Sequence, residues 1–318
     1  MKTALVTGIS GYLGSHVSKQ LKAEGWKVIG VDVVKPKHNY VDVFKQIDVR
    51  DRGGLSALFV STKIDAVFHF AGRIEIGESV KHPTEFWEVN VAGTCHILNC
   101  MKLHGVNNIL FSSSAGVYKP DRINKLFDIP ISEIEPTTFD HNPYSASKLA
   151  CEYAIKQSGL NYVIFRYFNL AGADPENDIG ENHEPETHLI PRIFQNLNSF
   201  ELYGDDFDTP DGTCVRDYVH VSDVAVAHIS GVDYLMNGGA SQILNLGTGQ
   251  GHSNLEIMCM ISERFHLDIN YETLPRRDGD PDSLVVDKNF QTVDPRIYAI
   301  SDYTKFSRIF RDELPHYK

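Results

Sequence analysis

The sequence predicts an α/β fold in which a doubly wound parallel sheet is followed by a smaller, loop-rich C-terminal domain. Two observations carry this prediction. Short apolar runs rich in β-branched residues alternate with helix-like segments over the first half of the 318 residues. That alternation is typical of a parallel sheet covered by helices. From about residue 170 onward, loops rich in Gly, Pro and Asp become frequent and the helix-like segments become shorter.

Six runs have the residue types of buried strands. Because they are apolar without interruption, we expect helices to cover both faces of the sheet. The expected strands span residues 4–6, 28–31, 66–70, 108–111, 162–165 and 243–246. Residues 84–104 carry apolar side chains at helical spacing, including Phe86 and Met101, which predicts a long helix packed on the core.

Chain length and loop content predict two domains. We expect residues 1–170 to form the first domain, with segments near 215–250 returning to it, and residues 171–318 to form mainly the second. Loops at 172–185, 204–212 and 275–282 should lie over the ends of the strands, because ligand-binding loops of such sheets gather there.

The composition excludes several classes of partner. A formal net charge of -12 without a basic stripe disfavours binding to nucleic acids or anionic membranes. No stretch approaches 18 uncharged apolar residues, and the first apolar run ends at Gly8, too early for a signal peptide. The five cysteines form no CxxC pair, which favours reduced thiols over disulfides or a metal site. We therefore expect a soluble cytoplasmic protein without a metal.

A glycine-rich turn connects the first expected strand to the first helix. Gly8, Gly11 and Gly14 have the order of a dinucleotide fingerprint. Such glycines let the backbone approach a pyrophosphate at the helix N-terminus. Asp32 ends the second strand, where a carboxylate accepts hydrogen bonds from the adenosine ribose and repels a 2′-phosphate. These features predict a Rossmann-like domain that binds NAD rather than NADP.

Ser114, Tyr144 and Lys148 form the candidate catalytic group. Tyr144 and Lys148 lie four positions apart at the start of an expected helix, so both project from one face. Ser112 and Ser114 end the preceding strand, at the sheet edge where ligands bind. To act as a base at neutral pH, a tyrosine of pKa ~10 must lose about three units, roughly 4 kcal/mol. An ammonium about 4 Å away, helped by an oxidised nicotinamide, supplies stabilisation of that order. Ser114 can then hydrogen-bond the hydroxyl being oxidised.

Several longer motifs carry a resemblance to a known family. They include VNVAGT around Asn90, FSSSAGVY around Ser114, RYFNLAGA from Arg166, ETHLIP around His188, and YGDDFDTPDGTCVRDYVHVSD from Tyr203. On these motifs, together with the glycine turn and the candidate catalytic group, the chain resembles the bacterial UDP-glucose 4-epimerases of the extended short-chain dehydrogenase/reductase family. The resemblance extends over almost the whole chain.

The resemblance implies the cofactor and substrate contacts. With the three glycines and Ser112, the NAD site would include Tyr12, Leu13, Asp32, Asp48, Val49, Phe70, Ala71, Gly72, Asn90, Tyr144, Lys148 and Phe168. The UDP-sugar site would include Ser114, Tyr144, Asn169, His188, Leu189, Tyr203, Arg216, Arg277, Asp280 and Leu284. Arg216 and Arg277 come from distant loops, and two guanidinium groups converging on a diphosphate would form a clamp. Otherwise they are surface arginines paired with Asp217 or Asp278.

The resemblance also implies a reaction. Tyr144 would remove the proton of the sugar C4 hydroxyl while NAD takes the C4 hydride, and the 4-keto sugar would turn before the hydride returns. Leu284 stands where a tyrosine tends to exclude N-acetyl sugars, so UDP-N-acetylglucosamine is a further expected substrate beside UDP-glucose and UDP-galactose. A homodimer joined through the helices that begin near Thr84 and Tyr144 is expected as well.

Some positions depart from the family pattern, and two alternatives stay open. The stretch between Asp32 and Asp48 is short, and the tail after Asp287 matches poorly. Ala115 and Gly116 follow Ser114 and cannot act as acid or base, which argues against a 4,6-dehydratase. The alternatives are another 4-epimerase of nucleotide sugars on the same scaffold and a catalytically silent NAD-binding regulator.

Overall fold

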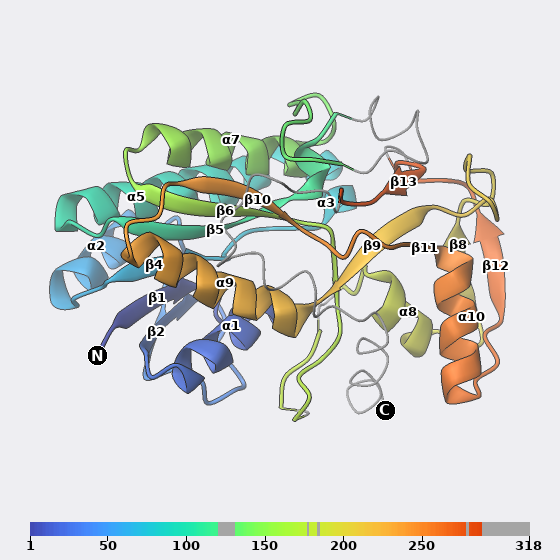
Figure 1. Cartoon of the computed structure of the whole chain (residues 1–318), viewed down its shortest axis with the longest axis horizontal. Coiled ribbons are helices and arrows are strands. Elements are labelled where there is room, and N and C mark those ends of the chain that lie inside the picture. The colour runs from blue at the N-terminus through green and yellow to red at the C-terminus, as the bar shows by residue number, and fades with distance from the viewer. Residues whose placement is uncertain (120–130, 177, 183–184, 278–279, 288–318) are drawn as a thin grey trace.

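A seven-stranded parallel sheet forms the centre of the computed structural model (Figure 1). The structure describes residues 1–119, 131–176, 178–182, 185–277 and 280–287. The strands follow the order β10-β6-β5-β4-β1-β2-β3. Their bounds are Thr3–Thr7 (β1), Lys27–Asp32 (β2), Val43–Gln46 (β3), Ala66–His69 (β4), Asn108–Ser114 (β5), Asn161–Tyr167 (β6) and Gln242–Leu246 (β10). All six predicted strands are confirmed. Of the seven strands of this sheet, only β3 was missed, because its side chains are half-buried or exposed and form no apolar run.

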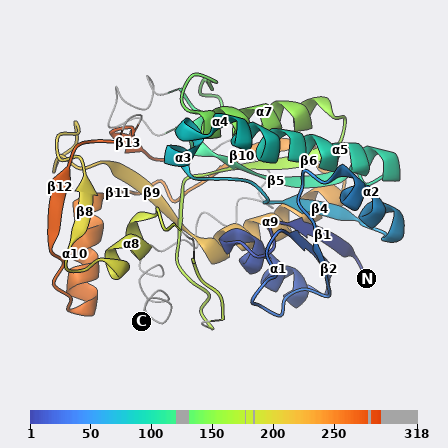
Figure 2. The ribbon, with the colours of Figure 1, turned by 180° about the vertical axis from the view of Figure 1, so that it is seen from behind.

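Helices cover both faces of this sheet (Figures 1 and 2). On one face lie α1 (Tyr12–Ala23) and α9 (Val221–Met236), and on the other α2 (Arg52–Ser61), α5 (Gly93–His104) and α7 (Pro143–Gln157). Ala4 and Val6 of β1 join the apolar core under α1 and α9, whereas Leu5 joins the core under α2, α5 and α7. The doubly wound prediction is therefore confirmed: successive residues of one strand contribute to two separate cores.

The helix predicted over residues 84–104 consists of three helical parts. A short helix α3 (Ile76–Lys81) precedes them; α4 covers Pro83–Phe86, the π-helical segment η1 covers Trp87–Ala92, and α5 continues from Gly93. The sequence pattern predicted the helical path but not the π-helical part, because the apolar spacing continues through it. Such π segments are rare, and those that exist are frequently found at functional sites.

The second half of the chain builds a smaller region beyond the carboxyl ends of the main strands (Figure 1). A four-stranded sheet contains β7 (Asn169–Ala171), β9 (Val215–His220), β11 (Gly251–Ser253) and β13 (Ser283–Leu284), and a parallel pair contains β8 (Phe200–Tyr203) and β12 (Tyr271–Leu274). The helices α8 (Leu189–Gln195) and α10 (Asn254–Phe265) pack with them around a separate apolar core.

The predicted boundary between two domains stays a prediction. Of the residues expected to return to the first domain, α9 and β10 belong to the large sheet and its helices, while β9 pairs within the small sheet. The tail after Asp287 lies outside the described residues. All five cysteines are free thiols, and among the described residues no helix is long and apolar enough to cross a membrane.

Candidate active site

The glycine turn forms a tight link between β1 and α1. Gly8 has a φ of 71°, and a Cβ atom there would lie only 2.6 Å from the backbone nitrogen of Ala71. Glycine is therefore required both by the backbone conformation and by the close approach of the β4 strand end. Gly11 caps α1 without a side-chain acceptor, and the first turn has no acidic residue. The first N–H groups of α1 are thus suited to receive an anion.

Asp32 supports this turn from the end of β2. Its carboxylate accepts hydrogen bonds from the backbone nitrogens of Ser10 at 2.9 Å and Val34 at 3.1 Å. The short segment after Asp32 folds back on the turn, since the Ser10 hydroxyl donates to the Val34 carbonyl at 2.6 Å. His38 Nε2 also lies 3.0 Å from the carbonyl oxygen of Ile9. Sequence reasoning missed His38 because nothing in its local pattern indicates a contact with a turn so far back in the chain.

The residues after β4 lie close to Asn90 and Lys148. A Cβ atom at Gly72 would lie 2.9 Å from Asn90 Oδ1 and 3.6 Å from Lys148 Nζ. Asn90 is 2% exposed; its amide accepts from the Arg73 nitrogen at 2.8 Å and donates to the Ser147 hydroxyl at 2.9 Å. The structure thus brings Gly72, Asn90 and Lys148 together from three separate elements.

The other predicted cofactor residues differ in their surroundings. Tyr12 and Leu13 are buried in the first turn of α1, and the Tyr12 hydroxyl donates to the Gly172 carbonyl. Val49 is buried against Gly93, whereas Asp48 is half-buried and paired with Arg50, which lowers the pKa of its carboxyl. Phe70 is half-buried, and Phe168 is buried in a small cluster with Ala115 and Tyr118.

The candidate catalytic residues Ser114, Tyr144 and Lys148 lie together at the carboxyl edge of β5. Asn142 caps α7 by accepting from the Ser145 nitrogen at 2.9 Å, so Tyr144 lies in the first helical turn. The Ser114 side chain lies near enough to the Tyr144 hydroxyl to lower its pKa. One turn later, the Lys148 ammonium donates to the carbonyl oxygen of Ser112 at 2.9 Å and is 2% exposed.

The electrostatics of this group differ from the prediction. Burial raises the pKa of Tyr144 to about 12, opposed by the Ser114 side chain and assisted by the negative charge of Glu75. Burial also lowers the pKa of Lys148 to about 8. The lowered pKa of Tyr144, expected from Lys148 together with an oxidised nicotinamide, is not found in the protein without cofactor, because desolvation of the phenol has the largest effect.

Apart from Ser114 and Tyr144, the predicted substrate residues lie on the small region. Asn169 pairs in register with Tyr218 of β9, and His188 caps α8 and contacts Glu181, with Leu189 as the first residue of the helix. Tyr203 ends β8, and the guanidinium carbon of Arg277 lies 4.2 Å above its ring centroid. Arg277 is exposed.

Arg216 is buried in the small sheet and held by backbone carbonyls. Its Nη1 donates to the carbonyl oxygens of Val215 and Pro281, each at 2.9 Å, and its Nη2 lies 3.5 Å from Asp280 Oδ1. Asp217 instead accepts hydrogen bonds from the nitrogens of Thr248, Gly249 and Val286. A pair between Arg216 and Asp217 is thus not what the structure shows, and Asp278 lies outside the described residues.

Both predicted arginines act on one buried thiol. The positive charges of Arg216 and Arg277 lower the pKa of Cys214, while burial raises it more strongly. Both guanidinium groups are therefore near enough to stabilise the same thiolate, although only Arg216 is buried. Leu284 pairs in register with Arg216 in the parallel β9–β13 contact.

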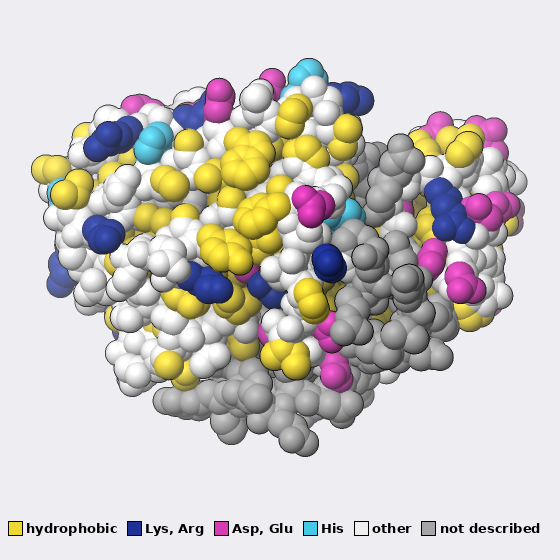
Figure 3. All heavy atoms as spheres, turned by 90° about the horizontal axis from the view of Figure 1, so that it is seen from above, with side chains coloured by type: hydrophobic (Ala, Val, Ile, Leu, Met, Phe, Trp, Pro, Cys, Tyr) yellow, Lys and Arg dark blue, Asp and Glu magenta, His cyan; other side chains and the backbone are white. Residues whose placement is uncertain are grey.

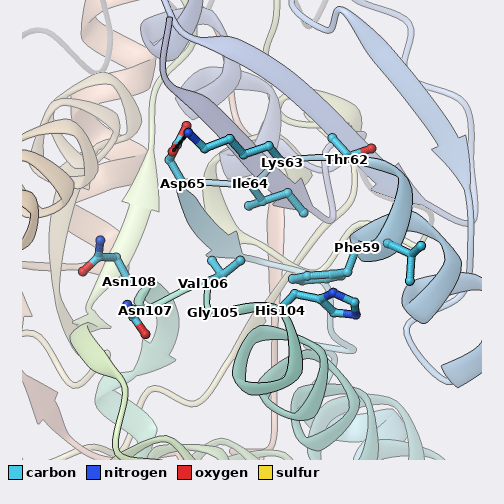
Figure 4. A pocket seen from close by; sticks show the side chains of 11 residues that line it. Phe59, Thr62, Lys63, Ile64, Asp65, His104, Gly105, Val106, Asn107 and Asn108 are labelled. Atoms are coloured by element: carbon cyan, nitrogen blue, oxygen red, sulfur yellow. Dashed lines mark ion pairs between the residues drawn. The ribbon is translucent and has the colours of Figure 1, made fainter.

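A separate pocket lies at the opposite end of the main sheet (Figure 4). Its lining includes Phe59 and Lys63 before β4 and His104, Val106 and Asn108 before or at the start of β5. These are the amino ends of the strands, whereas Ser114 and Tyr144 lie at the carboxyl edge. None of the predicted site residues lines this pocket.

Comparison with known proteins agrees with this geometry. A model of the NAD dependent epimerase/dehydratase family matches residues 4–247. A UDP-glucose 4-epimerase from Halalkalibacterium halodurans is 40% identical over 327 residues, covering 98% of this chain and 96% of that relative. The structure of a UDP-glucose 4-epimerase from Brucella ovis in complex with NAD is similar with a TM-score of 0.87 at 35% identity, covering 100% of this chain and 98% of that chain. A Stenotrophomonas maltophila enzyme of the same name, with bound NAD and formylated UDP-arabinopyranose, has a TM-score of 0.88 at 33% identity with the same coverage. The chain therefore belongs to the NAD-dependent epimerase/dehydratase family.

Proposed function

We propose that this protein is an NAD-dependent 4-epimerase of UDP-hexoses that works through a transient 4-keto sugar. The observation that carries the proposal is the placement of Ser114, Tyr144 and Lys148 together at the sheet edge that also holds the glycine turn, with Lys148 one helical turn after Tyr144. This is the donor and base arrangement that oxidation of a secondary alcohol needs. Relatives named UDP-glucose 4-epimerase support the choice of substrate.

NAD fits the residues present. The uncapped start of α1 suits a pyrophosphate, and the Asp32 carboxylate has lone pairs beyond those that Ser10 and Val34 use. Lys148 has N–H donors beyond the one that Ser112 accepts, so it can also bind a ribose hydroxyl. When bound, NAD supplies a reversible two-electron acceptor for the sugar C4. We propose that the remaining predicted NAD residues line the same site.

Tyr144 is the proposed base and acid. Its oxygen takes the proton from the C4 hydroxyl and later returns it to the same oxygen, while Ser114 hydrogen-bonds that oxygen throughout. Both epimers carry the same C4 oxygen, so one base can serve the reaction in both directions. A pKa of about 12 keeps Tyr144 protonated in the protein alone, so base strength at neutral pH depends on positive charge that arrives with the oxidised cofactor.

The sugar nucleotide is proposed to bind on the small region. Arg216 is held in position by two backbone carbonyls, and its long contact with Asp280 leaves Nη2 ready for a phosphate oxygen. Arg277 is the second proposed phosphate ligand, with Asn169, His188, Leu189 and Tyr203 lining the nucleotide. A firm hold on the diphosphate and a loosely held hexose would allow the keto sugar to present either face.

We also propose a homodimer. Exposed apolar side chains gather on the face formed by α3, η1 and α7 and the turn before α7 (Figure 3), namely Ile76, Val80, Trp87, Phe139 and Tyr153. The rings of Phe139 and Tyr153 stack with centroids 5.8 Å apart. Large contiguous apolar patches of this kind mark interfaces.

We also propose a cytoplasmic location, supported by the five free thiols, which suit a reducing compartment.

The decisive experiment uses purified protein with UDP-galactose and no added NAD. The proposal expects UDP-glucose to form, because the cofactor is retained through purification and nothing is consumed. Tyr144→Phe is the matched control and should form it at least about 100-fold more slowly. Protein that contains NAD but leaves UDP-galactose unchanged would favour the silent regulator, and turnover of only a different nucleotide sugar would favour the sister 4-epimerase.

A further inference from the structure

A continuous set of buried hydrogen bonds runs beneath the candidate cofactor site. The Thr7 hydroxyl at the end of β1 lies 2.6 Å from Nδ1 of His69, at the end of β4. His69 Nε2 lies 2.9 Å from the Thr94 hydroxyl of α5, and that hydroxyl lies 2.6 Å from the carbonyl oxygen of Asn90 in η1. All four residues are at most 2% exposed, so water cannot replace any of these bonds.

The carbonyl at one end of this set determines where the protons lie. The Asn90 carbonyl can only accept, so the Thr94 hydroxyl donates its single proton to that carbonyl at 2.6 Å; its longer contact with the Cys151 sulfur, at 3.3 Å, also directs the proton away from His69. The Thr94 oxygen must then accept from His69 Nε2–H, which leaves Nδ1 to accept from the Thr7 hydroxyl. The Thr7 oxygen accepts in turn from the backbone nitrogen of Ala71 at 3.3 Å. The bonding pattern therefore requires the Nε2–H form of His69.

His69 is also neutral. Burial lowers its pKa to about 3, and the nearby positive charge of Lys148 contributes in the same direction. A second buried histidine, His228, has the opposite arrangement: its Nδ1 lies 2.7 Å from the Val224 carbonyl and its Nε2 2.7 Å from the Tyr167 hydroxyl. Because a carbonyl only accepts, His228 carries its proton on Nδ1. The molecule thus contains an internal reference for the other tautomer.

The far end of the set controls a residue of the candidate cofactor site. The Asn90 carbonyl belongs to the π-helical segment and accepts both the Thr94 hydroxyl and the Cys151 thiol, at 3.2 Å for the thiol. The Asn90 side chain holds the backbone of Arg73 through two hydrogen bonds and the Ser147 hydroxyl through a third. Fixing the Asn90 backbone therefore fixes the segment that follows Gly72.

We propose that His69, in its Nε2–H form, is a positioning residue that ties the end of β1 to the π-helical turn and so holds Asn90 in place against the cofactor. The proposal rests on the proposed function in one respect, which is that Asn90 borders bound NAD. His69 touches no reacting atom. Its effect is expected in how long NAD stays bound rather than in how the sugar nucleotide binds.

Two matched pairs of variants test this role in the NAD-loaded protein. His69→Gln places an amide N–H near the position of Nε2, whereas His69→Asn places an amide oxygen near Nδ1 and leaves Thr94 without its donor. Thr94→Ser keeps the hydroxyl, whereas Thr94→Val keeps the shape and removes it. The measurements are the rate at which NAD leaves the protein, captured by an excess of a second dehydrogenase, together with kcat, KM and the melting temperature.

We expect His69→Asn and Thr94→Val to release NAD about tenfold faster than the natural chain or more, because each variant loses at least one buried hydrogen bond. His69→Gln and Thr94→Ser should stay within about twofold. KM for UDP-galactose should be unchanged in all four, since Arg216 lies on the small sheet. If the members of each pair release NAD at the same rate, the proposal is overturned, whatever their melting temperatures. The threonine pair decides the matter if His69→Asn does not fold.

Nitrogen NMR of the histidine side chains gives an independent result. Correlations between the ring carbon-bound protons and the two ring nitrogens should show the Nε2–H pattern for His69 and the Nδ1–H pattern for His228. An Nδ1–H pattern for His69 overturns the proposal. Neither result depends on catalysis: a natural chain without NAD or epimerase activity would reject the proposed function, while NAD-loaded, active protein with equal release rates would reject only the role of His69.

Discussion

Leu284 lies directly opposite Arg216 in the parallel pair of β13 and β9. Leu284 is half-buried and packs against the cluster that contains Phe168, a predicted cofactor residue. Leu284 therefore neighbours both the strand that carries the arginine proposed to hold the diphosphate and the cluster that contains an aromatic residue proposed to line NAD. This is where the hexose must lie if both proposals are correct, so the size of residue 284 should affect which sugars fit.

Leu284→Tyr should narrow the range of substrates. The natural chain is expected to epimerise UDP-N-acetylglucosamine beside UDP-glucose, because leucine leaves room for an acetyl group. A ring at this position should lower kcat/KM for the N-acetyl sugar about 10- to 100-fold, the range that ~1 to 3 kcal/mol allows. Turnover of UDP-galactose should be kept. A natural chain with no N-acetyl activity, or a variant that loses both activities equally, would refute the role of Leu284.

Tyr144→Phe should remove turnover while leaving binding intact. The phenol oxygen is the proposed base, and loss of a general base lowers kcat by about 10²- to 10⁴-fold. Binding of UDP measured by calorimetry should change little, because the proposed phosphate ligands lie on other elements. Ser114→Ala is the comparison variant, expected to lower kcat less. Near-normal turnover in Tyr144→Phe would exclude the proposed mechanism.

Stability of the protein freed of NAD should depend on pH through Lys148. Its pKa is about 8 in the folded protein against an ordinary value of 10.5, so the unfolded state binds more protons between these values. The free energy of unfolding gained through Lys148 therefore rises with pH across this window, by a few kcal/mol in total. Tyr144, with its pKa raised from 10.0 to about 12, has the opposite effect between pH 10 and 12.

Urea unfolding of the natural chain and of Lys148→Met, from pH 7 to 10, isolates the contribution of Lys148. The unfolding free energy of the natural chain should increase relative to that of Lys148→Met as pH rises. A difference that is constant across this range would show that Lys148 titrates at its ordinary value.

Heat-denatured protein should release NAD rather than NADP. The Asp32 carboxylate lies beside the glycine turn, where its charge repels a 2′-phosphate. Asp32→Ala should weaken NAD binding by about tenfold or more, since a hydrogen bond to a charged group is worth ~1.5 to 3 kcal/mol. Chromatography of the released nucleotide checks both statements. Recovery of mostly NADP from the natural chain would contradict the role given to Asp32.

The double variant Trp87→Glu, Tyr153→Glu should be monomeric. These side chains are 41% and 48% exposed on the apolar face formed by η1 and α7, and two charges per protomer at an interface are costly to desolvate. Val60→Glu is the control, because Val60 is 70% exposed on α2, away from that face. Sedimentation at micromolar concentration should give a dimer for the natural chain and the control. A monomeric natural chain would reject the proposed interface.

Much of the site could be predicted because its signals are local. Gly8 and Gly14 flank a turn that neighbouring residues in the sequence suffice to predict. The spacing of Tyr144 and Lys148 alone places them on one face of a helix. The order of strands and helices followed from apolar runs, since burial on both faces leaves no polar alternation. Strand β3 was missed for the same reason: its side chains are not buried, so it carries no apolar signal.

What the tertiary structure decided depends on contacts between distant segments. By itself, the sequence determined the fold class, the cofactor turn and the candidate catalytic group. Only the folded chain showed that Lys148 donates to Ser112, that burial raises the pKa of Tyr144, and that Arg216 is held by the carbonyls of Val215 and Pro281. Likewise, no pattern near His69 indicates Thr7 or Thr94. Desolvation and hydrogen-bond direction are set by whatever surrounds a group in space, and residues far apart in the chain supply those surroundings only after folding.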